Sequence, residues 1–243
     1  VMAMAEAGLP VLAALVLCAR GVDTLEKARA FLAVDGLPLP DPFLLCDMDK
    51  AAARIERALA GNEYIAVYGD YDVDGITSTC LLTRYLRSRG GRVVPYIPDR
   101  LEEGYGLNRE AVDALHAAGV TLIVTVDCGI ACKNEVADIL KAGVEVYITD
   151  HHEAADLVPE GVPVADPKCD ANCPSSILAG VGVAFFLMAA LNGKLEAMSG
   201  KRMDMRQVLD LVALGTLADM ERLIREAARR GIRIIMDLVL NHS

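Results

Sequence analysis

Hydrophobic positions follow two different spacings along the chain, and the spacing changes near residue 60. Up to that point, apolar residues recur at helical intervals or in short runs, as in Leu9 to Ala19, Thr24 to Val34 and Asp49 to Leu59. These segments predict helices, separated by the proline-rich segment Gly36 to Pro42, which is expected not to be helical. Residues 1–60 are therefore predicted to form a helical amino-terminal arm.

From Tyr64 onward, short apolar runs rich in β-branched residues alternate with helical spacings. The predicted strands are Tyr64 to Gly69, Arg92 to Ile97, Leu122 to Asp127, Glu145 to Thr149 and Val162 to Ala165. The predicted helices are Ile76 to Arg89, Arg109 to Ala118, Ala131 to Ala142, Gly180 to Leu191 and Arg206 to Leu217. Alternating strands and helices, with strands that are apolar almost throughout, predict an α/β fold with a five-stranded parallel sheet covered on both faces.

Composition narrows the possible functions. The formal net charge is -10, which argues against a protein that grips nucleic acid through bulk positive charge, so any nucleic acid must be held locally. Seven cysteines, an odd number, do not indicate a disulfide framework and favour a reducing cytoplasm. The pairs Cys128 with Cys132 and Cys169 with Cys173 lack the close spacing of zinc knuckles. The apolar run from Leu9 to Ala19 is too short to span a bilayer.

Three aspartates follow the first predicted strand at alternate positions: Asp70, Asp72 and Asp74, with Gly75 after them. In an extended chain their side chains would share one direction, because strands have a side-chain period of two. One interpretation is a solvated turn whose aspartates cap the helix near Ile76. The other is a site for hard divalent cations, which prefer oxygen ligands and offset the repulsion between carboxylates. The triplet favours the cation site.

Two further predicted strands lead into ionisable residues. Asp127 ends the third strand, and Asp150, His151 and His152 follow the fourth. Ligands of open parallel sheets bind outside the carboxyl ends of the strands, so these groups and the three aspartates are expected at one rim. Asp127 and Asp150 could each cap a following helix, whereas two adjacent histidines both need partners. Carboxylates with imidazoles suit Mn²⁺, and less well Mg²⁺ alone, and they describe a two-metal hydrolytic centre.

Glycines open the helix that follows the sheet. Gly180 and Gly182 stand at its predicted start. Backbone N–H groups at a helix start can approach an anion, so a phosphate contact is one interpretation. Close helix packing explains the two glycines about as well.

Several of these segments together resemble one family. Asp150-His151-His152 is the signature of the DHH phosphoesterases, and Val67 to Thr79 is similar to the first motif of their RecJ branch, the single-strand-specific DNA exonucleases. Over residues 8–219, further segments resemble RecJ: Val126 to Ile130, Leu214 to Asp219, Leu178 to Phe185, Pro98 to Leu107 and Pro40 to Leu44.

The resemblance implies a two-metal centre that holds Mn²⁺ or Mg²⁺. The implied ligands are Asp70, Asp72, Asp74, Asp127, His151 and Asp219. Asp127 is the implied bridging ligand, and His152 is implied as a phosphate contact or acid, so the candidate catalytic residues are Asp127, His151 and His152. Candidate substrate contacts are Arg100, Gly180 and Gly182. Some DHH members have a histidine where Tyr68 stands, which makes Asp70 a candidate for that ligand's role.

The resemblance to RecJ ends at Asp219, so the expected parts are an arm (1–60), a DHH domain (61–219) and a tail (220–243). RecJ proteins continue into a second α/β domain and usually an oligonucleotide-binding fold, which the tail does not resemble. Glu221 to Arg230 predicts a helix and Ile232 to Val239 a strand, similar to one helix and strand of α-amylase-type glycoside hydrolases. A single αβ unit cannot build a barrel, so we interpret the tail as a junction of coding segments or an assembly artefact without activity.

Three functional hypotheses follow from the resemblance. The first is metal-dependent phosphodiester hydrolysis in single-stranded DNA from the 5′ end. The second is a DHH enzyme for short oligonucleotides or small nucleotides, which the acidic charge would suit. The third is an inactive fragment that binds metal or a partner.

Overall fold

The fold is described from a computed structural model. It describes residues 1–32, 39–99, 101–153, 157–169, 173, 175, 177–199 and 203–229. For residues 197–199 and 221–229 only the backbone is described. The chain divides into two compact units, Val1–Pro40 and Asp41–Ser243. The smaller unit consists of α1 (Met2–Glu6), α2 (Val11–Ala19) and α3 (Leu25–Leu32). These helices bury a small core of Met4, Ala14, Leu17 and Ala28, which confirms that the amino-terminal region is helical.

The larger unit is built on a five-stranded parallel sheet, which confirms the predicted fold class. Its strands lie in the order β2-β1-β3-β4-β5. Their bounds are β1 (Tyr64–Gly69), β2 (Arg92–Tyr96), β3 (Leu122–Val126), β4 (Glu145–Thr149) and β5 (Val164–Ala165). β3 is buried at all of its positions, as expected for a central strand of a sheet covered on both faces.

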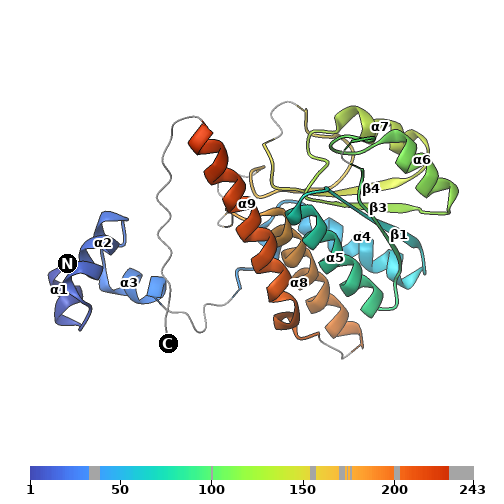
Figure 1. Cartoon of the computed structure of the whole chain (residues 1–243). Helices are drawn as coiled ribbons and strands as arrows, with labels where there is room; N and C mark the ends of the chain where they lie inside the picture. The colour runs from blue at the N-terminus through green and yellow to red at the C-terminus, as the bar shows by residue number, and fades with distance from the viewer. Residues whose placement is uncertain are drawn as a thin grey trace. The chain divides into compact units, whose positions relative to one another are not determined.

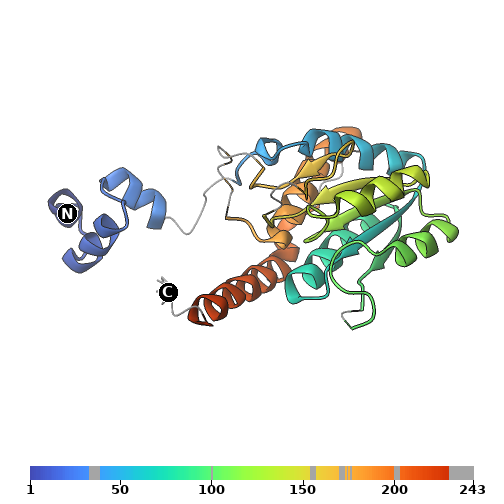
Figure 2. The ribbon, with the colours of Figure 1, turned by 90° about the horizontal axis from the view of Figure 1, so that it is seen from above.

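Helices cover both faces of the sheet (Figures 1 and 2). One face carries α4 (Met48–Ala60), α5 (Val73–Ser88) and α8 (Gly180–Ser199), which share a core with alternate residues of β1 and β3. The other face carries α6 (Arg109–Ala117) and α7 (Lys133–Lys141). A last long helix, α9 (Leu209–Arg229), follows the short turn η3 (Met205–Val208) and packs on α5 and α8.

Three sequence expectations need correction. Helix α4, assigned to the arm, packs in the core of the larger unit, because its apolar face of Met48, Ala51, Ile55 and Ala58 is fully buried there. The proline-rich linker ends in a 3₁₀ turn, η1 (Pro42–Leu44), because proline is tolerated in the first helical turn and Asp41 accepts a hydrogen bond from the Phe43 amide. Helix α5 begins at Val73 rather than Ile76, so the chain is no longer extended at Asp74.

The carboxyl-terminal part of the chain is described only as far as Arg229. Helix α9 runs from Leu209 to Arg229 without a break, so the expected boundary after residue 219 falls inside a helix. The predicted strand Ile232 to Val239 lies outside the described residues, and the interpretation of the tail stays a prediction. No helix in the described part of the chain is both long and apolar enough to cross a bilayer.

Candidate metal centre

The sheet topology defines where a ligand site is expected. Strand β1 lies between β2 and β3, and the two successive crossovers use helices on opposite faces, α5 on one and α6 on the other. In open α/β sheets such a switch point opens a crevice at the carboxyl ends of the two central strands. Here the residues at that point are Asp70, directly after β1, and Asp127, directly after β3.

The strand register aligns a row of carboxylates along this rim. Gly69 pairs with Val126, Val126 with Thr149, and Thr149 with Ala165. The residues that follow these paired positions are Asp70, Asp127, Asp150 and Asp166. Neighbouring parallel strands are only about 4.8 Å apart, so the row concentrates negative charge that needs compensation. The structure thus brings together the strand-end acids that the sequence predicted and adds Asp166.

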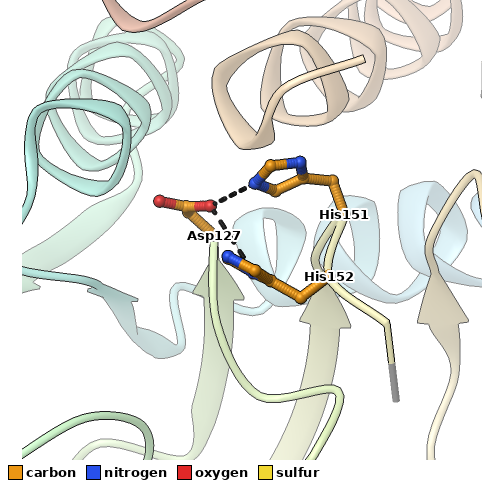
Figure 3. A group of neighbouring side chains, drawn as sticks. All are labelled: Asp127, His151 and His152. Atoms are coloured by element: carbon orange, nitrogen blue, oxygen red, sulfur yellow. Dashed lines mark ion pairs between the residues drawn. The ribbon is translucent and has the colours of Figure 1, made fainter. Parts of the chain in front are cut away.

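Asp127 stands at the centre of the rim. Its side chain is 1% exposed, and no hydrogen bond from the described residues reaches either carboxylate oxygen. His151 Nε2 lies 3.0 Å from Asp127 Oδ1 and His152 Nδ1 lies 4.0 Å from it. Figure 3 shows both imidazole rings turned toward this carboxylate. The backbone of Asp127 has φ 60°, a left-handed conformation that turns the chain sharply at the end of β3. Burial, and then the carboxylates of Asp74 and Asp72, raise the pKa of Asp127 far above its ordinary value.

A first group of possible ligands lies on the β1 side of Asp127. One oxygen each from Asp70, Asp72 and Asp127 lie within 4.8 Å of one another, close enough to bind one cation. Asp72 also caps α5, because its Oδ1 accepts a hydrogen bond of 3.0 Å from the Gly75 amide. The capping interpretation is therefore correct for Asp72, and the same carboxylate also belongs to the ligand group.

A second group lies on the β4 side. One ligand atom each from Asp74, His151 and Asp219 lie within 4.8 Å of one another, and His151 Nε2 is 3.6 Å from Asp74 Oδ2. Asp74 comes from the first turn of α5 and Asp219 from α9, so two packed helices supply these carboxylates. Burial, and then His152, lower the pKa of His151, which keeps this imidazole neutral and able to bind a metal.

The helix start at Gly180 meets this second group. The amides of Gly180 and Val181 donate hydrogen bonds of 2.7 and 2.8 Å to the two carboxylate oxygens of Asp74. The helix-start amide that the sequence offered to a phosphate therefore donates to Asp74. A Cβ on Gly180 would lie 2.6 Å from Asp127 Oδ1, whereas a Cβ on Gly182 would meet the side chain of Leu178. Close packing accounts for both glycines here.

Asp150 organises the histidines from below the rim. It is fully buried, and its Oδ2 accepts from the Ile130 amide at 3.0 Å. Its Oδ1 accepts from the His151 amide at 2.7 Å and lies 2.7 Å from His152 Nδ1. Burial raises the pKa of Asp150, but the hydrogen bond from His152 and the backbone donors outweigh burial and lower it overall. Asp150 therefore stays ionised and orients His152, whose side chain is 29% exposed beside the rim.

Tyr68 does not face the metal centre. Its side chain is fully buried on the other face of the sheet, among residues of α6 and α7. The hydroxyl donates to the Gly106 carbonyl at 3.1 Å and accepts from the Asn108 amide at 3.2 Å, so it holds the loop after β2. That Asp70 replaces a histidine ligand at this position stays a prediction.

Sequence reasoning missed two residues of the site, and one predicted residue cannot be placed. Asp166 is 1% exposed, and its Oδ2 receives no hydrogen bond from the described residues. Burial raises its pKa to about 6. Its place after the fifth predicted strand was the signal that could have identified it. Tyr105, whose hydroxyl lies 3.3 Å from His152 Nδ1, carried no such signal. Arg100 lies outside the described residues.

The donors at this rim fit divalent cations. Hard cations take carboxylate oxygens, and neutral imidazole adds a ligand suited to Mn²⁺. Asp127 is buried with two carboxylate oxygens that no hydrogen bond from the described residues satisfies, a costly arrangement that a bound cation would compensate. The first ligand group includes Asp127, and His151 of the second lies 3.0 Å from Asp127 Oδ1, so a cation in each group could share this carboxylate. A third possible group joins Asp127 to His151 and His152.

Comparisons with known proteins agree with this site. Residues 64–216 match the profile of the DHH family, N-terminal domain. The chain belongs to the DHH family. Its sequence is 43% identical over 211 residues to the single-stranded-DNA-specific exonuclease RecJ of Bacillus subtilis, and 40% identical over 226 residues to that of Thermus thermophilus. These alignments cover 86% and 87% of this chain but 26% and 33% of the relatives, so the chain spans about a quarter to a third of their length.

Solved structures of the DHH family give the same result. A crystal structure of exonuclease RecJ bound to manganese aligns with TM-score 0.66 and 40% identity, covering 76% of this chain and 45% of that one. RecJ of Thermus thermophilus with Mn²⁺ aligns with TM-score 0.63 and 36% identity, covering 76% of this chain and 25% of that one. Another RecJ structure from the same organism is a complex with Mg²⁺. The metal ions in those relatives are the ones that the donor set described above suits.

Proposed function

We propose that this chain carries the two-metal centre of a single-stranded-DNA exonuclease that hydrolyses phosphodiester bonds from the 5′ end. The observation that carries the proposal is a pair of possible ligand groups connected through Asp127. One contains Asp127 itself, and His151 of the other lies 3.0 Å from Asp127 Oδ1; their members are Asp70, Asp72 and Asp127, and Asp74, His151 and Asp219. The similarity to RecJ exonucleases supports the choice of substrate.

Each residue has a proposed role in this reaction. Two divalent cations, Mn²⁺ or Mg²⁺, supply when bound the positive charge that clamps a phosphate and makes a water molecule more acidic. Asp127 is the carboxylate that both ligand groups would use. Asp74 accepts hydrogen bonds from the first amides of α8 and so positions the start of that helix beside its ligand group. His152 is oriented by Asp150 at the edge of the site, where its ring can contact a phosphate.

Short oligonucleotides or small nucleotides are a second candidate substrate class, to be compared directly with single-stranded DNA. The net charge of -10 disfavours a long nucleic-acid track and suits short oligonucleotides or small nucleotides. An inactive metal-binding fragment is the alternative without turnover. Both alternatives are separated from the first proposal by substrate length and by activity.

The test is hydrolysis with Mn²⁺ of 5′-labelled and 3′-labelled single-stranded DNA, a matched duplex and dinucleotides. We expect immediate release of labelled mononucleotide from the 5′-labelled strand and little cleavage of duplex. Asp127→Ala should reduce turnover by about three orders of magnitude or more, because the two cations lose their shared ligand. Asp113→Asn is a matched control, since Asp113 forms an exposed ion pair with Arg109 on α6.

Different outcomes would reject different parts of the proposal. Preferential cleavage of dinucleotides would favour the small-substrate enzyme. No turnover with Mn²⁺ or Mg²⁺ would favour the inactive fragment. Turnover of Asp127→Ala within tenfold of wild type would reject the role of Asp127.

A further inference from the structure

Tyr105 lies next to His152 at the edge of the metal centre, and it is not one of the possible metal ligands. Its hydroxyl oxygen is 3.3 Å from His152 Nδ1, and the two rings meet edge to face with centroids 6.0 Å apart. The residue as a whole is 49% exposed, so part of it lies at the surface next to the site. Tyr105 thus combines access to solvent with contact to the site.

The loop that carries Tyr105 is held from the far face of the sheet. Tyr68 binds the loop backbone at Gly106 and Asn108 through its hydroxyl. The ring of Tyr68 stacks on Tyr96 at 5.0 Å, and the Tyr96 hydroxyl donates to Glu103 at 2.6 Å. Tyr105 is therefore fixed by anchors on both sides of it in the sequence.

Two glycines set the local backbone at Tyr105. Gly104 and Gly106 have φ angles of 79° and 89°, which a side chain would strain. A Cβ on Gly106 would also lie 2.9 Å from Cys132 Sγ. The loop conformation that brings Tyr105 to His152 is thus specified by its own sequence.

The hydrogen-bond pattern leaves the Tyr105 proton available. Both carboxylate oxygens of Asp150 accept hydrogen bonds from backbone amides, so this carboxylate is arranged as an acceptor, and His152 Nδ1, 2.7 Å from Asp150 Oδ1, then carries the hydrogen that it donates. A protonated Nδ1 has no lone pair, so it cannot accept the hydrogen of the Tyr105 hydroxyl. The Tyr105 hydroxyl oxygen can therefore only accept, weakly, from the Nδ1–H group that already donates to Asp150. The hydrogen of the hydroxyl itself remains available for another acceptor.

We propose that the Tyr105 hydroxyl is a further substrate-binding group of this centre, which donates a hydrogen bond to a non-bridging phosphate oxygen of the bound nucleotide. The inference rests on the proposed function, since it names a contact to the same phosphate. A phosphate beside His152 and Asp127 would be within reach of the Tyr105 hydroxyl, which lies 3.3 Å from the His152 ring. The contact adds a neutral donor to a rim that is otherwise rich in carboxylates.

The phenol acts as a hydrogen-bond donor and does not transfer its proton. Burial, and then the carboxylate of Asp150, raise the pKa of Tyr105 above its ordinary value. A phenol that is less acidic than usual stays protonated throughout the neutral range, so the hydrogen bond persists. No bond of the substrate is made or broken by Tyr105.

The first test compares wild type, Tyr105→Phe and Tyr64→Phe for binding of thymidine 5′-monophosphate in excess Mg²⁺ by calorimetry. Tyr105→Phe removes only the hydroxyl, and its affinity should be about tenfold weaker or more, as for a hydrogen bond to a charged group. Its kcat/KM on 5′-phosphorylated single-stranded DNA should fall by a similar factor, while Mg²⁺ affinity stays unchanged. Tyr64→Phe is the control, because Tyr64 begins β1 at the opposite end of the sheet and faces Arg92.

A second test separates a direct contact from an effect exerted through His152. Tyr105→Phe should weaken nucleotide binding by the same factor in a His152→Ala background, because the proposed hydrogen bond goes to the phosphate itself. If the effect disappears in that background, Tyr105 acts only by holding His152, and the proposal is wrong. The proposal is also wrong if Tyr105→Phe binds the nucleotide within twofold of wild type, or if wild type binds none.

The proposed function and this inference can fail separately. If wild type hydrolyses DNA normally and Tyr105→Phe matches it in both measurements, only the Tyr105 contact is rejected. If wild type binds the nucleotide through Tyr105 but cleaves no DNA, the contact stands and the exonuclease proposal falls.

Discussion

At the scale of single residues, Asp127 is a buried carboxylate close to other carboxylates, and a bound cation would offset both the burial and the repulsion. Its carboxyl group is buried among other acids, which raises its pKa well above the value of about 3.9 expected in an unfolded chain. Above that pH the cation-free folded state retains a proton that the unfolded state has lost. The free energy of unfolding should therefore be highest below about pH 4 as far as Asp127 contributes, and decrease as pH rises toward the folded-state pKa.

This predicts how Asp127→Asn changes stability in the presence of a chelator. The amide cannot ionise, so the variant should lose less stability between pH 5 and pH 8 than wild type, and should be more stable than wild type by about 1 kcal/mol or more at pH 8. Urea unfolding in EDTA across that range measures both effects. Asp113→Asn, on the exposed face of α6, should follow the wild-type curve. An Asp127→Asn curve parallel to wild type would show that the buried carboxylate carries no such penalty.

At the scale of elements, the site depends on how closely α9 approaches α5. Gly215 of α9 faces Thr77 and Asp74 of α5, and a Cβ there would lie 2.9 Å from Asp74 Oδ1 and still closer to Thr77 Oγ1. Gly215→Ala should push α9 outward and carry Asp219, one turn later, away from Asp74 and His151. Mn²⁺ affinity of that ligand group should fall by about tenfold, as measured by titration. Gly193→Ala is the matched control, because a Cβ at Gly193 of α8 meets nothing within 4 Å among the described residues. Equal Mn²⁺ binding by both variants would mean that the approach of α9 does not position Asp219.

Elements with a local sequence signal could be predicted, whereas their packing on distant elements could not. β1 was predicted at its observed bounds because an apolar run ending in charge is a local signal, and the parallel order then placed Asp70 and Asp127 at one rim. Asp219 was reached only through family resemblance, since the approach of α9 to α5 depends on contacts distant in sequence. The position of Tyr105 beside His152 depends in the same way on a loop anchored from the opposite face. Local periodicity also could not tell that α4 belongs to the core of the larger unit.

At the scale of the whole molecule, the acidic charge limits how DNA is held. With a net charge of -10, few phosphates of single-stranded DNA should be neutralised on binding. Affinity for a 20-nucleotide strand should be weak, and the slope of log affinity against log salt should be smaller in magnitude than about 2, which corresponds to roughly three phosphates. Fluorescence anisotropy with Ca²⁺ replacing Mn²⁺ measures the slope. Tight binding with a steep slope would reveal a basic groove on this chain.

The central claim is that two cations share Asp127. Electron paramagnetic resonance of the chain titrated with Mn²⁺ tests it most directly, because two Mn²⁺ ions that shared this carboxylate would be close enough to couple, and a spin-coupled spectrum differs from that of isolated ions. Wild type should bind two equivalents and develop the coupled signal, and Asp127→Ala should lose the coupling while Asp113→Asn keeps it. A wild-type chain that saturates with one uncoupled Mn²⁺ would contradict the account.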